Sequence, residues 1–595
     1  MNRSTLARRY APLAAALAVQ LVIIVLAPST AQKGTTLASG GGASSFAAGA
    51  DTGGDNGAGG AAGAAGGAAG GAAGGGAGGA AGAAAARGAG GLPPGVATGD
   101  TAHCVGGRQY DSGIAYWAPP CVPGLPGAPF PNNGGSPGPG VTADSITIID
   151  YVTNYGAEVN AILQAEGALV TADDAKPFDA AIQNFINKRY TLYGRKVKII
   201  TYASGCQAVP PNVPCLTQEI DKVIDQYKPF GMYWNTTLCS ACFAEMARKH
   251  VVAFGGDGFS DEFANQLAPY FYSGGESATR VETAFAQWWC NQMSSTNAPS
   301  RKVKYAKTNN PSQNFNGQAR RLGVISTNDP DNEDTVKKVL DPALAKCGDK
   351  IWHTYFYDQN INTAAQQVEA GIAAMDTPTD PANVVLCLCD QVAPAFLYNG
   401  EQHHNYFPEN VIASDQQMDW DTTGQSYVYG NPSLGCPTPS QGCEYDLAFG
   451  LSIESPQASQ DNDEGMRIFH DGGGQGPKPP GNMTAVTASL WAKYYSMIAN
   501  FMENTGPNLT AANMQAQAVR IPPVGGGTSG QALLGVAPGD WNWTQDVRVV
   551  YFDKHAKSSY NGQPGTYVQV QGPRFNLGQF PQMPDGPVLP GGRTP

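Results

Sequence analysis

The sequence predicts an α/β fold of two lobes joined by a hinge, each lobe a doubly wound parallel sheet, with a disordered Gly/Ala-rich tether in front of them. Three observations predict it. From about residue 141, short apolar runs alternate with segments whose apolar residues recur at helical spacing, which is typical of parallel sheets with helices on both faces. The same alternation starts again near residue 322. Residues 34–97 are almost entirely Gly and Ala, and such a stretch buries too little apolar area to offset the entropy of ordering it.

The N-terminus has the pattern of an export signal. Three arginines precede an apolar segment at 11–27, and small residues follow at 29–31, which is the order found in a secretory signal peptide, here residues 1–31. An uncleaved membrane anchor is the alternative, because the segment is almost long enough to cross a bilayer; the small residues favour cleavage. Residues 32–140 are predicted to be a disordered linker. We therefore expect a secreted, cell-surface or periplasmic protein, tethered to the membrane if this segment is retained.

The first lobe is expected at residues 141–300. Its strands are predicted at 146–152, 196–202, 230–234, 251–254 and 270–273. Its helices are predicted at 176–190, 216–227, 238–250 and 281–293. In the first of these helices Phe178, Ile182 and Phe185 share one face, which we expect to pack on the sheet.

The second lobe is expected at residues 301–444. Its strands are predicted at 322–326, 351–357, 384–389 and 411–413, and its helices at 335–347, 364–375 and 396–403. Residues 445–552 are expected to cross back to the first lobe, with strands at 445–454 and 548–552, a loop-rich excursion at 461–480, and helices at 483–503 and 508–520. Gly and Pro dominate residues 553–595, which predicts a C-terminal tail with little regular structure.

Charge and cysteine content limit the partners and the compartment. The net charge is −12 and only 14% of the residues are charged, so the positive face that nucleic-acid binding needs is not expected. The twelve cysteines are even in number, and together with the export signal they predict disulfides. Four pairs are close in sequence: Cys104 with Cys121, Cys206 with Cys215, Cys239 with Cys242, and Cys436 with Cys443.

The Cys239/Cys242 pair also has the spacing of a redox-active motif. A structural disulfide is favoured, because the other cysteines indicate an oxidising compartment and the flanking pattern is not that of a redox domain. Cys387 and Cys389 lie on one face of an apolar strand, so we do not expect them to bridge each other.

The alternatives for Cys387 and Cys389 are pairing with Cys290 and Cys347, or a state as buried thiols. Together with His403 and His404 they match no zinc pattern, and no metal or other cofactor is expected.

The stretch 230–262 combines two predicted strands with polar loops at their ends. The loops are formed by Asn235, Thr236 and Thr237, and by Asp257, Gly258, Phe259 and Ser260. Small molecules bind beyond the carboxyl ends of parallel strands, so these loops are candidates for a ligand wall. The alternatives are structural: Asn and Thr cap helices, and Gly-Gly-Asp-Gly is ordinary turn chemistry, which is slightly favoured for the second loop. The aromatic residues Tyr233, Trp234, Trp288 and Trp289 are expected in the core rather than at a ligand.

The order of the elements and four stretches resemble one family. The stretches are Gly140-Val-Thr-Ala-Asp-Ser-Ile-Thr-Ile before the first strand, Tyr193-Gly-Arg-Lys-Val-Lys before the second, Ser489-Leu-Trp-Ala-Lys-Tyr-Tyr in the late helix, and Gly506-Pro-Asn-Leu-Thr after it. With these, residues 141–552 resemble the type I periplasmic solute-binding proteins, in particular the branched-chain amino-acid (Leu/Ile/Val) binding family of ABC importers.

The resemblance implies a ligand held between two lobes that close around it. It places Thr236 where the family has a small hydroxylic residue, and Gly258 and Phe259, flanked by Asp257 and Ser260, where the family has a second hydroxylic pair. In the second lobe it places Asp331 nearest the position of an aromatic ligand residue. Asp415 matches the acidic residue that pairs with a ligand amine. A polyol, amide or cationic ligand is therefore compatible with the sequence.

No enzyme is expected from the motifs. The seven His residues are scattered, and the sequence contains neither a Gly-x-Ser-x-Gly elbow nor a His-Glu-x-x-His motif. The sequence thus predicts a monomeric solute-binding protein that captures a small polar, amino-acid-like ligand and delivers it to ABC permease subunits in the membrane. A tethered sensor that uses the same clamp is the main alternative, and a secreted enzyme on a related fold is a weaker one.

Overall fold

Apolar runs in the first half of the chain form a five-stranded sheet. Its strands are β3 (Ser145–Asn154), β4 (Lys196–Gln207), β5 (Gly231–Trp234), β6 (Val252–Gly255) and β7 (Phe271–Tyr272). They lie in the order β4-β3-β5-β6-β7, and every neighbouring pair is parallel. The order reverses between β3 and β5, which makes that pair the topological switch point of the sheet.

The protein is seen in a computed structural model. It describes residues 104–105, 107–109, 118–166, 169–234, 236, 239–360, 363–390, 393–413, 419–430 and 444–589. The predicted signal peptide and the Gly/Ala-rich part of the tether lie outside these residues.

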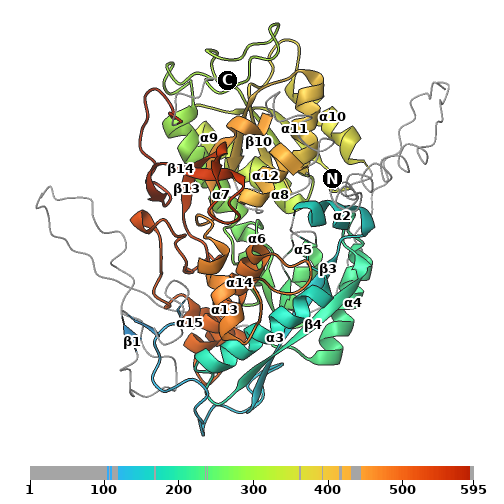
Figure 1. The fold of residues 1–595 in the computed structure, drawn as a ribbon, viewed down its shortest axis with the longest axis vertical. Coiled ribbons are helices and arrows are strands. Elements are labelled where there is room, and N and C mark those ends of the chain that lie inside the picture. Colours follow the sequence, from blue (N-terminus) through green and yellow to red (C-terminus); the bar gives the residue numbers. More distant parts are fainter. Residues whose placement is uncertain are drawn as a thin grey trace, which may run out of the picture. The chain divides into compact units, whose positions relative to one another are not determined.

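Helices α2 (Ala157–Glu166), α3 (Ala172–Arg189), α4 (Val213–Tyr227), α5 (Ser240–Arg248) and α6 (Asp261–Leu267) connect the strands of this first lobe. α3 begins with a capping box, in which the Thr171 side chain accepts from the Asp174 N–H and Asp174 accepts from the Thr171 N–H at 3.0 Å. Its face of Phe178, Ile182 and Phe185 is buried in the lobe's core, as predicted. Three later helices, α13 (Glu464–Asp471), α14 (Ala485–Thr505) and α15 (Ala511–Ala518), complete this lobe; α13 and α14 contact α3 although they are far from it in sequence (Figure 1).

The second lobe repeats the arrangement with seven strands. They are β8 (Leu322–Thr327), β9 (Ile351–Tyr357), β10 (Val384–Leu388), β11 (Glu409–Ala413), β12 (Phe449–Ser452), β13 (Val547–Lys557) and β14 (Pro564–Phe575), in the order β14-β13-β12-β11-β10-β8-β9. Strands β8 to β12 are parallel, and β13 and β14 are added antiparallel. The winding reverses between β8 and β10, so the second sheet has its switch point at the corresponding place.

The helices of the second lobe include α7 (Ala278–Trp288), which continues as a π turn through Met293, and α8 (Pro330–Thr335) and α9 (Asp341–Ala345), which are joined by another π turn. The others are α10 (Ala364–Met375), α11 (Ala393–His404) and α12 (Asp421–Gln425). Their core residues form a second apolar cluster, distinct from that of the first lobe. The predicted fold class, two α/β lobes built on parallel sheets, is confirmed.

The chain passes between the two sheets three times: from β7 to α7, from β12 to α13, and from α15 to β13. Both lobes belong to one compact unit, Gly82–Pro595. The buried Arg574 of β14 fixes two of these passages, because it pairs with Asp546 at 2.8 Å and donates to the carbonyls of Ile453 and Glu454, each at 2.7 Å.

Three expectations about the last third of the chain were wrong. Strands β12 and β13, expected in segments of the first lobe, pair within the second sheet. The excursion at 461–480 contains α13, capped by Asp463, which accepts from the Met466 N–H at 3.0 Å. The tail at 553–595 contains β14, because Tyr567 and Val570 bury against β13 and outweigh the surrounding Gly and Pro.

Part of the predicted disordered linker is also ordered. The two-stranded ribbon of β1 (Cys104–Val105) and β2 (Arg108–Gln109) contacts the first lobe, where Gln109 Nε2 donates to Glu503 Oε1 at 2.7 Å. Arg195 donates to the carbonyl of Gly135 at 3.1 Å. This Pro/Gly-rich segment therefore docks on the folded body.

Disulfides join Cys104 to Cys121, Cys206 to Cys215, Cys239 to Cys242, Cys290 to Cys347, and Cys387 to Cys389. The first three pairs were predicted, and Cys436 and Cys443 lie outside the described residues. The expectation that Cys387 and Cys389 do not bridge was wrong. Their Cα atoms are 5.1 Å apart, whereas two extended residues span about 7 Å, because Cys389 lies beyond the end of β10 where the chain bends.

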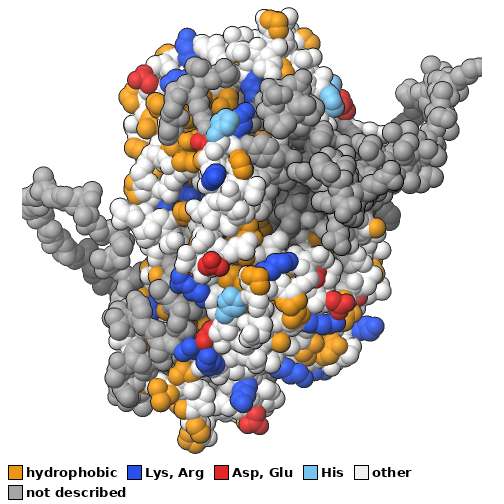
Figure 2. Space-filling view, viewed as in Figure 1, with side chains coloured by type: hydrophobic (Ala, Val, Ile, Leu, Met, Phe, Trp, Pro, Cys, Tyr) orange, Lys and Arg blue, Asp and Glu red, His pale blue; other side chains and the backbone are white. Residues whose placement is uncertain are grey.

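Among the described residues, no helix is both long and apolar enough to cross a membrane. On the face of the molecule seen in Figure 2, Lys and Arg side chains are scattered and Asp and Glu side chains are interspersed with them.

Candidate functional site

A cavity of about 220 Å³ lies where strand ends of the two sheets meet. The first lobe lines it with residues 150–153 of β3, Tyr155, residues of α2, Tyr233 and Thr236; the second lobe lines it with Tyr355, residues 357–360, and residues of β10, α10 and α11. Both groups lie at the switch points of their sheets, β3/β5 and β8/β10. This is the position at which open α/β sheets bind small molecules.

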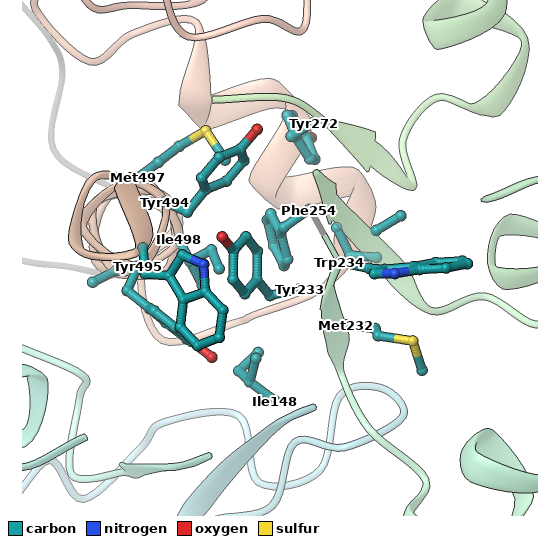
Figure 3. Packing of buried hydrophobic residues seen from close by; sticks show 14 of the residues in the cluster. Ile148, Met232, Tyr233, Trp234, Phe254, Tyr272, Tyr494, Tyr495, Met497 and Ile498 are labelled. Carbon is teal, nitrogen blue, oxygen red and sulfur yellow. The ribbon is translucent and has the colours of Figure 1, made fainter. Parts of the chain in front are cut away.

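Tyr233 shows how the first lobe shapes its wall. Successive side chains of a strand point to opposite faces, and Figure 3 shows Tyr233 pointing toward α14 while Met232 and Trp234 point to the other side. Its ring centroid lies 5.0 Å from that of Tyr494 and 5.7 Å from that of Trp491. The Tyr233 side chain is buried, and in the described part of the chain its hydroxyl has no hydrogen-bond partner.

Two buried carboxyl groups, one of them in the cavity wall, lie next to each other in the first lobe. Asp150, on β3, lines the cavity, and burial raises its pKa well above the usual value, with a further rise from the charge of Asp179. Burial raises the pKa of Asp179 to about 7, although Asp179 accepts a hydrogen bond from the Thr201 hydroxyl at 2.5 Å. Two adjacent carboxyl groups that cannot both ionise share a proton.

Thr236 and Asp257 are the predicted site residues that line the cavity. Asp257 is held by its own lobe, because one carboxylate oxygen accepts from the Gly275 N–H at 2.7 Å and from the hydroxyls of Ser273 and Tyr494. The carboxylate of Asp257 is thus fixed in orientation.

The second lobe contributes polar groups at the ends of β9 and β10. The Tyr357 hydroxyl donates to Asp390 Oδ2 at 2.7 Å, and Asp390 Oδ1 accepts from the Ala393 N–H at the start of α11 at 3.0 Å. The Cys387–Cys389 disulfide also lines the cavity.

The other predicted site residues are not in the cavity wall. Phe259 packs in the core against Phe243 and Phe263, with ring centroids 5.4 and 4.5 Å apart, and Gly258 lies in the turn before it. Ser260 and Asp331 contact each other across the lobes: the Ser260 N–H and hydroxyl donate to the Asp331 carboxylate at 2.7 and 2.6 Å.

Three further predicted residues, Asn235, Thr237 and Asp415, lie outside the described residues.

Sequence reasoning missed most of the wall. The residues concerned are Asp150, Tyr155, Tyr355, Tyr357, Asp390, Phe396, Trp420 and Trp491. Several of them end predicted strands, so applying the strand-end rule to every strand, and not only to those in 230–262, would have found Tyr355, Tyr357 and Asp390. Trp491 carried no such signal, because only the packing of α14 on β5 brings it to the cavity.

Over the described ranges, no group of three or more His, Cys, Asp or Glu side chains is arranged to hold a metal ion. The wall combines aromatic rings, hydroxyls, amides and carboxyl groups. Such a wall suits reversible binding of a small organic molecule.

The two α/β lobes enclose this cavity between the ends of their strands. No protein-family model and no curated protein sequence matches the chain. It is similar in structure to a solute-binding protein of an ABC transporter from R. palustris in complex with 4-hydroxybenzoate, with 11% sequence identity, 73% of this chain and 98% of that chain covered, and a TM-score of 0.48.

Two further solved structures are similar to the chain. One is a possible leucine/isoleucine/valine-binding protein from Rhodopirellula baltica, with 13% identity, 72% and 96% of the two chains covered, and a TM-score of 0.47. The other is a branched chain amino acid ABC transporter protein from Thermus thermophilus with bound valine, with 11% identity, 73% and 98% covered, and a TM-score of 0.46. The fold of the chain itself follows from the strand order above.

Proposed function

We propose that the protein is an exported solute-binding protein that captures a small organic ligand between its lobes and delivers it to the membrane subunits of an ABC importer. The observation that carries the proposal is that one cavity is lined by strand ends at the switch points of both sheets. A ligand in that position touches both lobes at once, so it stabilises the arrangement in which they are close together.

The cavity also fits a binding role better than a catalytic one. Its wall is mostly apolar and aromatic, and its polar groups are held by neighbours within the same lobe, as with Asp257 and Gly275 at 2.7 Å. Fixed polar groups orient a ligand without reacting with it. Delivery of the ligand to a permease is proposed from the resemblance of the sequence to the solute-binding proteins of ABC importers.

A thermal-shift screen of the full chain tests the proposal. The compounds are amino acids, amides, amines, short-chain acids and sugars. A ligand present at a hundred times its Kd adds about 2.7 kcal/mol to the free energy of unfolding, which raises the melting temperature by several degrees. Isothermal calorimetry then gives the Kd and the stoichiometry, for which one site is expected.

Two matched variants locate the binding. Ala393 lines the cavity at the start of α11, so Ala393→Phe fills part of it, whereas Ala370→Phe places the same ring on the exposed face of α10. Ligand stabilisation is expected to disappear in the first variant and to persist in the second. A ligand that stabilises both variants equally binds elsewhere, and the absence of any stabilising compound contradicts the proposed function.

A further inference from the structure

We propose that the ligand of this cavity is an organic cation, with an amine or quaternary ammonium group on a small apolar body. The inference rests on the proposed function, because it assumes that the cavity between the lobes binds a solute. It specifies the chemical class that the sequence left open.

The first argument is the charge of the wall. Asp150, Asp257, Asp358 and Asp390 line the cavity, and no Lys, Arg or His does so among the residues that the structure describes. An anionic ligand would therefore meet carboxyl groups that no basic side chain of the described wall offsets, whereas a cation is attracted.

The second argument is how these carboxyl groups are held. Asp257 and Asp390 both accept hydrogen bonds from backbone N–H groups, from Gly275 at 2.7 Å and from Ala393 at 3.0 Å. These hydrogen bonds fix the orientation of each carboxyl group at the cavity. Asp358 is exposed at the rim, whereas Asp150 is buried beside Asp179, so carboxyl groups line both the rim and the buried part of the cavity.

The third argument is the aromatic lining. Tyr155, Tyr233 and Trp491 line the cavity from the first lobe, and Tyr355, Tyr357 and Phe396 line it from the second. Ring faces attract cations, and several rings around a carboxylate-containing site are the usual recognition of ammonium groups. The rings also supply the apolar surface that the rest of the ligand needs.

The fourth argument is an unused hydrogen-bonding group. The Tyr233 side chain is only 1% exposed, it lines the cavity, and its hydroxyl has no partner in the described part of the chain. A buried hydroxyl without a partner costs free energy. An N–H of a bound ammonium group, or the hydroxyl of an amino alcohol, would satisfy it.

Two sets of matched probes test the inference by calorimetry on the full chain. The first set shares one branched apolar body and differs in the charged groups attached to it: 3-methylbutan-1-amine, the zwitterion leucine and the anion 4-methylpentanoate. The second set is choline and 3,3-dimethylbutan-1-ol, in which a carbon replaces the charged nitrogen. We expect each cation to bind about tenfold more tightly than its uncharged, zwitterionic or anionic partner.

Variants of the wall separate charge from shape. Asp358→Asn removes one carboxylate at the rim and is expected to weaken the binding of the amine about two- to fivefold. Asp341→Asn, which removes an exposed carboxylate on α9 away from the wall, is expected to change nothing. Tyr355→Leu is expected to weaken choline binding about threefold or more, while Tyr355→Phe, which keeps the ring, preserves it.

The outcomes are distinguishable. If leucine or 4-methylpentanoate binds more tightly than the amine, or the neutral alcohol binds as well as choline, the inference is wrong and the proposed function stands. If none of the five probes binds, the inference is wrong, and the broader screen described above then decides the proposed function by itself.

Discussion

At the scale of single residues, the buried pair Asp150 and Asp179 is the least expected feature of the first lobe. Among the described residues, Asp150 Oδ2 and Asp179 Oδ1 find no hydrogen-bond donor other than a proton on the opposite carboxyl group. The groups that face the pair are the hydroxyl of Thr201 and the phenols of Tyr233 and Tyr495, none of which supplies a positive charge. The folded protein therefore favours the protonated form of the pair.

This preference predicts a pH dependence of stability. Because the folded-state pKa of Asp179 is raised to about 7 from 3.8, the folded state binds more protons than the unfolded state between these values. The contribution is fully present below about pH 4 and is lost as the pH rises to about 7. Each unit of pKa corresponds to about 1.4 kcal/mol. The free energy of unfolding of the wild type is therefore expected to fall between about pH 4 and pH 7, and Asp179→Asn is expected to make this fall smaller by about 2 kcal/mol or more.

Urea denaturation at pH 4.5, 6 and 7.5 measures the effect. Asp144→Asn, which changes an exposed carboxyl next to the start of β3, serves as the control and is expected to follow the wild-type profile. Parallel profiles for Asp179→Asn and the wild type would show that the pair does not titrate with folding.

At the scale of secondary-structure elements, the sequence predicted every strand from β3 to β13, because each contains a short run rich in apolar and aromatic residues between polar loops. It did not predict β14. Polar and apolar residues alternate in this strand, as in Val568, Gln569 and Val570, but Gly and Pro lie on both sides of them in the sequence. It did not predict α13 either, because eight residues give too few turns for helical periodicity to stand out. β14 is stabilised by its pairing with β13, and α13 by its packing on α14 and on the distant α3.

The buried arginine of β14, Arg574, predicts a large loss of stability when it is replaced. Arg574 is fully buried, it pairs with Asp546 at 2.8 Å, and it donates to the carbonyls of Ile453 and Glu454. Arg574→Met leaves the Asp546 carboxylate buried without its cation, which costs about 3–5 kcal/mol.

The measurement is the free energy of unfolding in urea. Replacing both members of the pair, in Arg574→Met with Asp546→Leu, is expected to recover part of the loss, because no uncompensated charge then remains. A loss below about 1 kcal/mol in the single variant would mean that β14 does not fix the passages between the lobes.

At the scale of the whole molecule, the two-lobed architecture was predictable and the composition of the cavity was not. The repeated alternation of strands and helices predicted two sheets. Because small molecules bind beyond the carboxyl ends of parallel strands, it also predicted the region of the cavity. The cavity wall contains Trp491 of α14, Tyr233 of β5 and Tyr355 of the other lobe. These residues are far apart in the sequence, and no local pattern predicts that they lie together. Ser260 and Asp331, predicted at the ligand, instead join the lobes to each other.

The contact between Ser260 and Asp331 gives the last prediction, which concerns closure. Two hydrogen bonds to a carboxylate, at 2.7 and 2.6 Å, stabilise the arrangement in which the lobes are close, and a hydrogen bond to a charged group contributes about 1.5–3 kcal/mol. Ser260→Ala removes the hydroxyl bond, so the closed fraction of the free protein falls, and the apparent Kd of a ligand that needs both lobes rises up to about tenfold. Small-angle scattering of the free protein should show a larger radius of gyration, which ligand at saturation restores. Ser145→Ala, whose hydroxyl bonds Thr142 within the first lobe at 2.9 Å, should change neither quantity. If Ser260→Ala leaves both the radius of gyration and the Kd unchanged, the contact does not control closure.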